Sequence, residues 1–288
     1  MPSSTAAIQT ISSLLARAIP LRWRRFVLYA RRHRRLPELI EPQRFTDKVN
    51  WRILYDRREL LSPTCDKLAV KELARRTAGD SVRIPRTLWS GTDLAELASV
   101  GLPDRWILKP THRWGKIVDG TGVPDVGQLT AHTKGWLFNE NWHIMGEWAY
   151  RHAQPAFLVE ERIGDGTGFP TDYKFFVFDG VARYVLHVSE RAADPCPTYY
   201  DRTWTRVATR PGSEDTPLAA PAAQLTEMLA VAERIAAGFD FLRVDLYNVD
   251  GEVWFGETAA YPVSGFARYS PGTFDLELGS WWQLPELQ

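Results

Sequence analysis

Residues 243–257, RVDLYNVDGEVWFGE, combine the pattern of an apolar β-hairpin with an Arg, an Asp and a Glu in its strands. Aromatic and β-branched residues favour a strand on each side of Asp250-Gly251, a pair that is typical of turns. Gly251 suits the left-handed residue that closes a type I turn. The sequence therefore predicts a three-residue loop at 249–251, with Asn248 opposite Glu252.

Side-chain alternation in this hairpin then sets the direction of the charges, because successive strand residues point to opposite faces. One face is predicted to carry Arg243, Asp245, Tyr247, Val253, Phe255 and Glu257. The other is predicted to carry Leu242, Val244, Leu246 and Trp254, which together make a core layer. The three charges should therefore meet on the face away from this core.

The composition excludes several classes of protein. The chain has 288 residues with 35 basic and 35 acidic side chains, so its net charge gives no reason to expect nucleic-acid binding. Two cysteines, Cys65 and Cys196, are too few for a disulfide framework or a cysteine-rich zinc site. No stretch approaches the ~20 apolar residues of a membrane span. The first residues also make a poor signal peptide. We expect a cytoplasmic protein.

The N-terminal segment is the basic part of the chain. Residues 8–36 are predicted to be helical, with Trp23, Phe26, Val27 and Ala30 at the spacing of one helix face and arginines elsewhere. One interpretation is a helix that docks by this apolar stripe and leaves its arginines in solvent. The other is peripheral contact with an anionic membrane, at the inner membrane face.

The remaining pattern predicts an α+β protein. Helices are expected over 45–61, with Thr46 or Asp47 as the N-cap, over 62–79 and over 225–240. Strands are expected near 84–91, 104–112, 156–164 and 171–190, followed by the hairpin. We divide the chain into a helical basic segment, 1–62, a first lobe, 63–157, and a second lobe, 158–288, that contains the hairpin.

Charged residues recur within these strand-like stretches. In chain order they are Lys109, Glu160, Glu161, Asp172, Lys174, Arg243, Asp245 and Glu257. Each one alone fits the solvated face of an antiparallel sheet. Together they are harder to explain that way, since two carboxylates on facing strands beside an arginine suit Mg²⁺ and a phosphate.

The order of these motifs resembles the ATP-grasp superfamily. RVDLY…GEVWFGE is similar to its metal-binding hairpin, WILKP to the strand with a phosphate-contacting lysine, and FLVEERIG to the hinge beside the adenine. CDKLAVK is similar to the helix that carries a further phosphate-facing lysine. FTDKVNWRILYDR, DYKFFVFDG and YPVSGF most resemble the TupA-like branch, which is found with teichuronopeptide and surface-polysaccharide genes. The resemblance extends from about residue 45 to the end.

The resemblance implies a two-lobed ATP-grasp fold and an ADP-forming carboxylate–amine ligase that uses ATP and Mg²⁺. Its substrates would be a small-molecule or glycan carboxylate and an amine. Asp245 and Glu257 would hold the metal, and Lys67, Lys109 and Arg243 would act on the phosphates. The implied nucleotide contacts also include Glu160, Glu161, Ile163, Asp172 and Lys174. Ser264 and Gly265 either contact the substrate carboxylate or form a turn without a binding role.

Two positions depart from the superfamily pattern. Ala259 stands where a second metal-ligating Asn is common, and Thr258 is a poor substitute because alternation points it away. The loop THRWGKIVDGTG, residues 111–122, is bulkier than the usual phosphate-covering loop, although Arg113 or Lys116 could supply cationic contacts. The alternatives to a ligase are therefore an ATP-grasp kinase that phosphorylates a hydroxyl, and a non-enzymatic nucleotide- or glycan-binding member.

Overall fold

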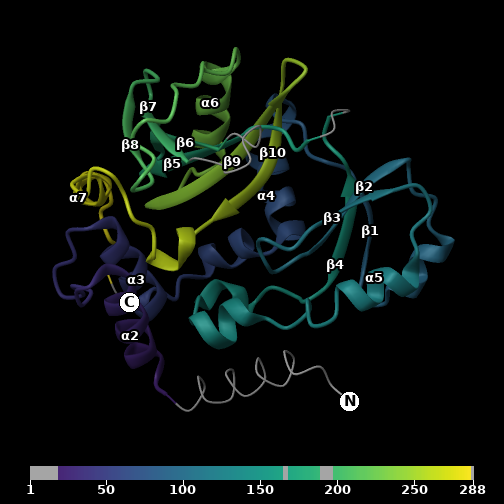
Figure 1. Ribbon diagram of the computed structural model, residues 1–288, viewed down its shortest axis with the longest axis horizontal. Coiled ribbons are helices and arrows are strands. Elements are labelled where there is room, and N and C mark those ends of the chain that lie inside the picture. Colours follow the sequence, from purple (N-terminus) through teal and green to yellow (C-terminus); the bar gives the residue numbers. More distant parts are fainter. Residues whose placement is uncertain (1–18, 165–167, 189–196, 287–288) are drawn as a thin grey trace.

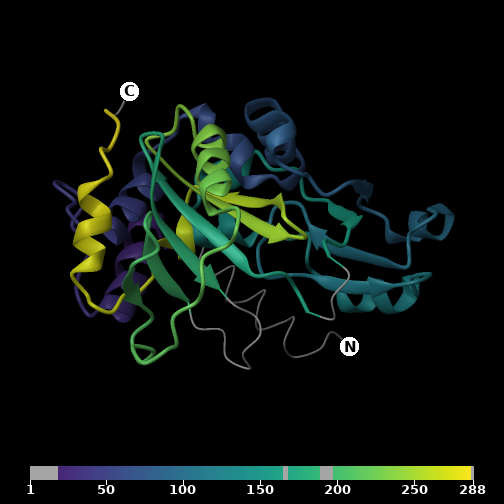
Figure 2. The same ribbon diagram turned by 90° about the horizontal axis from the view of Figure 1, so that it is seen from above.

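The computed structural model describes residues 19–164, 168–188 and 197–286, and it shows an α+β chain built on two antiparallel sheets. Cys196 lies outside these ranges, and Cys65 is buried and unpaired. The sheets stand side by side, with α4 (Lys67–Ala78) between them and α2 (Leu21–His33) and α3 (Phe45–Tyr55) beside the larger one (Figures 1 and 2).

The larger sheet has six strands in the order β10-β9-β5-β6-β7-β8. Their bounds are β5 (Asp172–Phe178), β6 (Val181–Val188), β7 (Thr198–Asp201), β8 (Arg206–Thr209), β9 (Phe241–Val249) and β10 (Glu252–Ala259). Helix α6 (Leu225–Ile235) packs on one face, against Leu242, Val244 and their neighbours. On the opposite face, Phe45 of α3 packs on Phe241 with ring centroids 4.9 Å apart. Lys174 of β5 and Asp245 of β9, which pair in register, lie farther along this second face.

The smaller sheet has the order β1-β4-β2-β3 and a separate core. Its strands are β1 (Thr87–Gly91), β2 (Arg105–Pro110), β3 (Val118–Thr121) and β4 (Phe157–Glu161). Trp106, Leu108 and Val159 pack there against η3 (Leu94–Ser99) and α5 (Val126–His132). Because β4 pairs with both β1 and β2, residues 158–161, which we assigned to the second lobe, lie in the smaller sheet.

The hairpin β9–β10 differs from the predicted register. Its turn has two residues, Asp250 (φ 53°) and Gly251 (φ 78°), so Val249 pairs with Glu252. This one-residue shift places Phe255, which is fully buried, opposite Leu246 in the core, and Trp254 opposite Tyr247. The predicted faces of Val253, Trp254 and Phe255 are therefore wrong.

A bulge at Gly256 then restores the alignment of the charges. Beyond it Glu257 pairs with Asp245 and Ala259 with Arg243, as their shared face required. A Cβ at position 256 would lie 3.0 Å from both the Asp245 carbonyl oxygen and the Tyr247 ring. A glycine is therefore the residue that this bulge accommodates.

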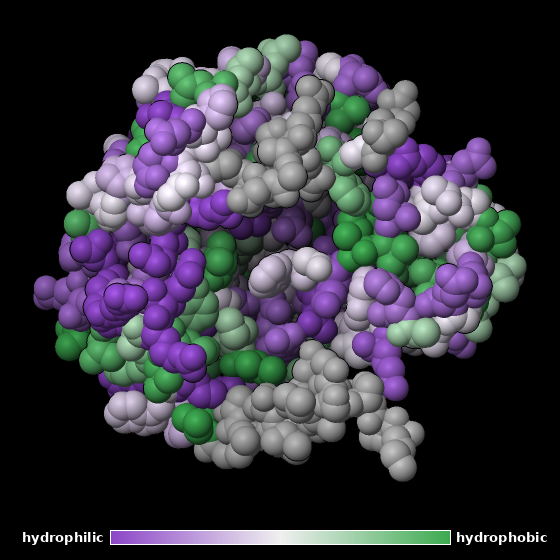
Figure 3. Space-filling view, viewed as in Figure 1, coloured by the Kyte–Doolittle hydropathy of each residue, from purple (hydrophilic) through white to green (hydrophobic). Residues whose placement is uncertain are grey.

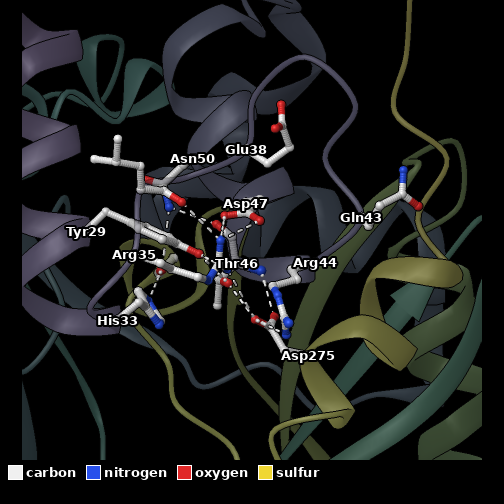
Figure 4. Close-up of polar contacts among 12 residues, drawn as sticks. Tyr29, His33, Arg35, Glu38, Gln43, Arg44, Thr46, Asp47, Asn50 and Asp275 are labelled. Carbon is white, nitrogen blue, oxygen red and sulfur yellow. Dashed lines mark hydrogen bonds and ion pairs between the residues drawn. The ribbon is translucent and has the colours of Figure 1, made fainter.

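The predicted N-cap of the helix that starts at residue 45 and the predicted start of the next helix are also wrong. The N-cap of α3 is Arg44, so Thr46 and Asp47 lie inside its first turn. Their side chains are used elsewhere: the Thr46 hydroxyl donates to Asp275 near the start of α7 (Phe274–Ser280), 2.7 Å away, and Asp47 pairs with Arg35 at 3.0 Å (Figure 4). Helix α4 begins at Lys67 because Asp66 caps it, and residues 62–65 belong to the 3₁₀ segment η1 (Glu59–Cys65).

Helix α2 docks by its polar side, not by the predicted apolar stripe. Trp23 and Val27 are 61% and 57% exposed, whereas Arg25 is fully buried. Arg25 donates there to the Asn50 side chain at 2.6 Å and to the Ser264 carbonyl, while its Nη1 atom has no hydrogen-bond partner among the described residues. The part of the predicted helix before residue 19 lies outside the described residues. No helix in the described ranges is both long and apolar enough to cross a bilayer.

Candidate active site

Two adjoining cavities lie where the smaller sheet faces the larger one. The first has a volume of about 290 Å³, and its lining includes Lys67, Lys109, Asp172, Asp245 and Glu257. The second has a volume of about 260 Å³, and its lining includes Lys174, Arg243 and again Glu257. Figure 3 shows a hollow in the middle of the molecule, where hydrophilic residues gather.

The charges on the larger sheet form one row across three strands. Lys174 on β5 pairs in register with Asp245 on β9, which pairs with Glu257 on β10. The Lys174 ammonium lies 2.7 Å from Asp245 and also contacts Asp172. Arg243 donates twice to Asp245, at 2.7 Å each, and lies 3.5 Å from Glu257. The sequence prediction that Arg243, Asp245 and Glu257 share one face is confirmed.

This network sets the ionisation of its members. Burial alone would raise the pKa of Asp245, but Arg243 and Lys174 hold that pKa below its ordinary value. Burial also opposes the charge on Lys174, yet Asp245 and Asp172 raise the pKa of this lysine. For Asp172, burial dominates and raises the pKa to about 6. Asp245 is therefore an anion at neutral pH, the form that a metal ligand requires.

Two lysines face this row from the other side of the first cavity. Lys67, the first residue of α4, lies 3.8 Å from Glu257 and donates to the Arg113 carbonyl at 2.5 Å. Lys109 on β2 contacts Glu160, which also binds Lys71 at 2.6 Å. Burial would raise the pKa of Glu160, but Lys109 and Lys71 hold this pKa below its ordinary value. The cavity thus has carboxylates on one wall and ammonium groups on the other.

Other predicted site residues lie outside the lining of both cavities. Glu160 is buried behind Lys109, and Glu161 accepts from the Arg86 backbone at 2.7 Å. Ile163 follows the end of β4. Ser264 is buried in η6 (Pro262–Gly265), where its hydroxyl donates to Glu147. A Cβ on Gly265 would lie 2.5 Å from the Asn50 side chain, so this glycine permits close packing against α3.

Several lining residues were missed by the sequence analysis. Phe169, Pro170, Ile117 and Tyr247 add apolar and aromatic surface to the first cavity. Glu147, Tyr150 and Tyr261 line the second. Glu147 and Tyr150 fall in or beside the short helical segments η4 (Asn141–Met145) and η5 (Trp148–Arg151), which have no charged strand pattern to mark them. Trp114, in the loop 111–122, lines both cavities.

The donor atoms of Asp245 and Glu257 fit a magnesium ion. Mg²⁺ prefers oxygen ligands and is commonly bound by one or two carboxylates together with substrate phosphates. Among the described residues, no group of three His, Cys, Asp or Glu side chains could hold a metal ion. A metal here would therefore share its coordination with a phosphate-bearing ligand in the first cavity.

Comparison with known proteins agrees with this geometry. Residues 47–283 match the TupA-like ATP-grasp family, so the chain belongs to that family. The two α+β lobes around the cavities are its ATP-grasp fold. No curated protein sequence matches the chain.

Three solved structures illustrate the structural similarity. One is D-alanine–D-alanine ligase from Helicobacter pylori, with 13% identity, 78% of this chain and 60% of that chain covered, and a TM-score of 0.44. A second is D-cycloserine synthetase DcsG, with 16% identity, 77% and 70% covered, and a TM-score of 0.43. The third is D-alanine–D-alanine ligase from Bacillus anthracis complexed with ATP, with 15% identity, 68% and 52% covered, and a TM-score of 0.39. The match thus covers about half the length of this last chain.

Proposed function

We propose that the protein is an ADP-forming carboxylate–amine ligase that uses ATP and Mg²⁺. The observation that carries this proposal is the arrangement of the first cavity, in which Asp245 and Glu257 face Lys67 and Lys109. Such a cavity suits a triphosphate with its metal ion. The second cavity opens beside it and offers room for a substrate next to the terminal phosphate.

Each residue has a distinct role in this proposal. Lys67 and Lys109 offset phosphate charge, while Asp245 and Glu257 hold Mg²⁺, which supplies further charge stabilisation. A substrate carboxylate oxygen attacks the γ-phosphorus and ADP leaves. An amine then attacks the acyl phosphate carbon, loses a proton and expels phosphate. Arg243, which lines the second cavity and lies 3.5 Å from Glu257, stabilises the negative charge that develops in both steps.

The family suggests the biological setting. TupA-like members are found with surface-polysaccharide genes, so we place the reaction in the decoration of a polysaccharide or the synthesis of a specialised metabolite. The amide product would join a small-molecule or glycan carboxylate to an amine.

Trapping with hydroxylamine tests this proposal. The protein is incubated with Mg·ATP, hydroxylamine and a panel of carboxylic acids, and hydroxamate and ADP are measured together. We expect at least one acid to give equal amounts of both products. ADP formation with phosphate transfer to a hydroxyl compound, and no hydroxamate, would indicate the kinase instead. Failure of the protein to release ADP with any acid or alcohol would favour the non-enzymatic binding member.

We further propose that α2 contacts an anionic lipid surface. Its outward residues Trp23 and Val27 are exposed, as is Ile19 just before the helix; Arg22 and Arg31 flank them, and the helix contains no acidic residue. Sedimentation with phosphatidylglycerol vesicles should fall severalfold when Trp23 and Val27 are both changed to Ser. Phosphatidylcholine vesicles are the control. Equal sedimentation of both proteins would contradict the contact. Deleting the whole helix is a poor test, because it would also remove the hydrogen bond from Arg25 to the Ser264 carbonyl, beside the second cavity.

A further inference from the structure

The second cavity contains a buried carboxylate that the proposed reaction does not use. Glu147 is 2% exposed and lines the cavity together with Tyr150 and Tyr261. Its carboxylate accepts a hydrogen bond from the Ser264 hydroxyl. Within the described ranges it forms no salt bridge, although the charge of Arg25 acts on it.

A buried carboxylate without an ion-pair partner is costly to keep in a fold. Burial raises the pKa of Glu147 to about 7, although the side chains of Ser264, Arg25 and Asn141 each act to lower it. By contrast, the carboxylates of Asp245 and Glu160 are each bound by two cations. A cavity-lining acid that stays unpaired in the protein is suited to pair with a ligand.

The position of Glu147 relative to the nucleotide cavity defines which ligand group it meets. Trp114, Gly115 and Glu257 line both cavities, whereas Glu147 and Tyr261 line the second alone. A carboxylate that attacks the γ-phosphate must lie at the shared end, where Arg243 and Lys174 offset its charge. The rest of the substrate molecule, with any other polar group that it carries, then extends into the second cavity toward Glu147.

The residues around Glu147, at the end of the second cavity away from the nucleotide, favour a cationic group on the ligand. A carboxylate accepts hydrogen bonds, and an ammonium group donates them with opposite charge. Tyr150 and Tyr261 place aromatic rings beside it, and ring faces also attract cations. The Tyr261 hydroxyl is held in place, since it accepts from the Ala149 backbone at 3.2 Å. The cavity thus has Arg243 and Lys174 beside Glu257 at the shared end, and Glu147 at the other.

We propose that the second cavity binds an amino-carboxylic acid as the acyl donor, with the carboxylate toward Arg243 and the ammonium group held by Glu147. This inference rests on the proposed ligase function, because that function places the donor carboxylate beside the nucleotide. The cavity volume of about 260 Å³ suits a single small amino acid or a molecule of similar size.

Calorimetry with matched acids tests the inference without turnover. L-Alanine, D-alanine, β-alanine and 4-aminobutanoate are each compared with propanoate or butanoate, in the presence of Mg·ADP. The wild type should bind at least one amino acid about 10- to 100-fold more tightly than its counterpart without the amino group, the range for one charge-assisted hydrogen bond. Glu147→Gln, which keeps the shape, should reduce this ratio to near one, and Glu147→Asp should retain part of it. Glu72→Gln, an exposed acid on α4, is the control.

An unchanged ratio in Glu147→Gln would overturn the inference, as would binding of acids without regard to the amino group or no binding of any amino acid. The same acids are then used with hydroxylamine and ATP. A Glu147-dependent preference in binding with no hydroxamate would retain the ammonium site and reject the ligase. Hydroxamate from acids that lack an amino group, at equal efficiency in both proteins, would retain the ligase and reject the ammonium site.

Discussion

Two clusters of arginines and aspartates lie on or beside the larger sheet, and they differ in what surrounds them. In the first, Arg52 is fully buried and binds Asp240 at 2.6 Å, and Arg58 joins Asp240 to Asp56. In the second, Arg243 binds Asp245, which also binds Lys174. Both clusters hold charges away from bulk water in similar ion pairs.

Their surroundings separate a structural role from a site. The Arg52 cluster is closed: the Trp282 indole donates to Asp240 at 2.6 Å, and the Arg52 guanidinium lies 4.3 Å from the Trp282 ring centre. The Arg243 cluster opens onto both cavities, and the Glu257 side chain at its edge is 31% exposed. Buried charge alone therefore does not distinguish the candidate site. What distinguishes it is that its carboxylates face a cavity and meet cations, Lys67 and Lys109, on the opposite wall.

The largest effect is expected at Asp245. Asp245→Asn removes a proposed metal ligand and should abolish ATP turnover, a loss of at least about 10³-fold. Its free energy of unfolding should fall less than that of an Arg52 variant, because Arg243 keeps Glu257 and Lys174 keeps Asp172 as partners. ADP release and urea unfolding measure the two quantities. Near-normal ADP release by the folded variant would remove the metal assignment.

Arg52→Ala should affect stability most. It leaves Asp56 and Asp240 with one arginine between them, and loss of one partner from a buried ion pair costs about 3–5 kcal/mol. Urea unfolding measures the change. Arg83→Ala, which removes an exposed pair with Glu252, is the control and should cost at most about 1 kcal/mol. If both substitutions lowered the free energy of unfolding equally, the buried Arg52 cluster would stabilise the fold no more than an exposed ion pair does.

Lys109→Ala tests the wall opposite the Arg243 cluster. Loss of one charged phosphate contact should weaken ATP binding about 10- to 100-fold. The buried Glu160 keeps Lys71 as a partner, so the protein should still fold. Calorimetric titration with ATP measures the affinity, and Lys134→Ala, at an exposed position, is the control. If ATP affinity were unchanged, Lys109 would serve only to neutralise Glu160.

The smallest effect is expected at Ala259, which pairs with Arg243 and lines the second cavity. The Thr258 hydroxyl donates to the Thr64 carbonyl at 3.0 Å, so it is turned to another partner. Ala259→Asn adds an amide oxygen and should lower the Mg²⁺ concentration for half-maximal activity a few-fold, on the order of one added ligand. ADP release measured against Mg²⁺ gives this value. A curve that is unchanged or shifted to higher Mg²⁺ would mean that the amide crowds the site.

The hairpin shows how far the sequence could predict the site. Alternation correctly placed Arg243, Asp245 and Glu257 on one face, although the predicted turn was one residue too long. The two-residue turn shifts the register and the bulge at Gly256 shifts it back, so both deviations cancel at Glu257. The bulge depends on packing of Gly256 against Tyr247 and the Asp245 backbone, a contact that no local pattern encodes.

Glu147 shows what local patterns miss. It lies in an irregular segment, and it is held by Ser264, 117 residues away in sequence. Arg25, from a helix outside the matched family region, contacts the same η6 turn. Such a site is assembled by tertiary contacts between short segments. Neither the periodicity of α2 nor the charges in the strands could have indicated it.

The central claim is that the Arg243 cluster binds a nucleotide through a metal ion, and one titration tests it directly. ATP is titrated calorimetrically into the wild type and Asp245→Asn, each with Mg²⁺ and with EDTA. Without the metal, Asp245 and Glu257 repel the phosphates, so the wild type should bind ATP at least about 10-fold more weakly in EDTA. The difference should shrink in Asp245→Asn, which has lost one charge and one ligand. Equal ATP affinity of the wild type with Mg²⁺ and with EDTA would contradict the claim.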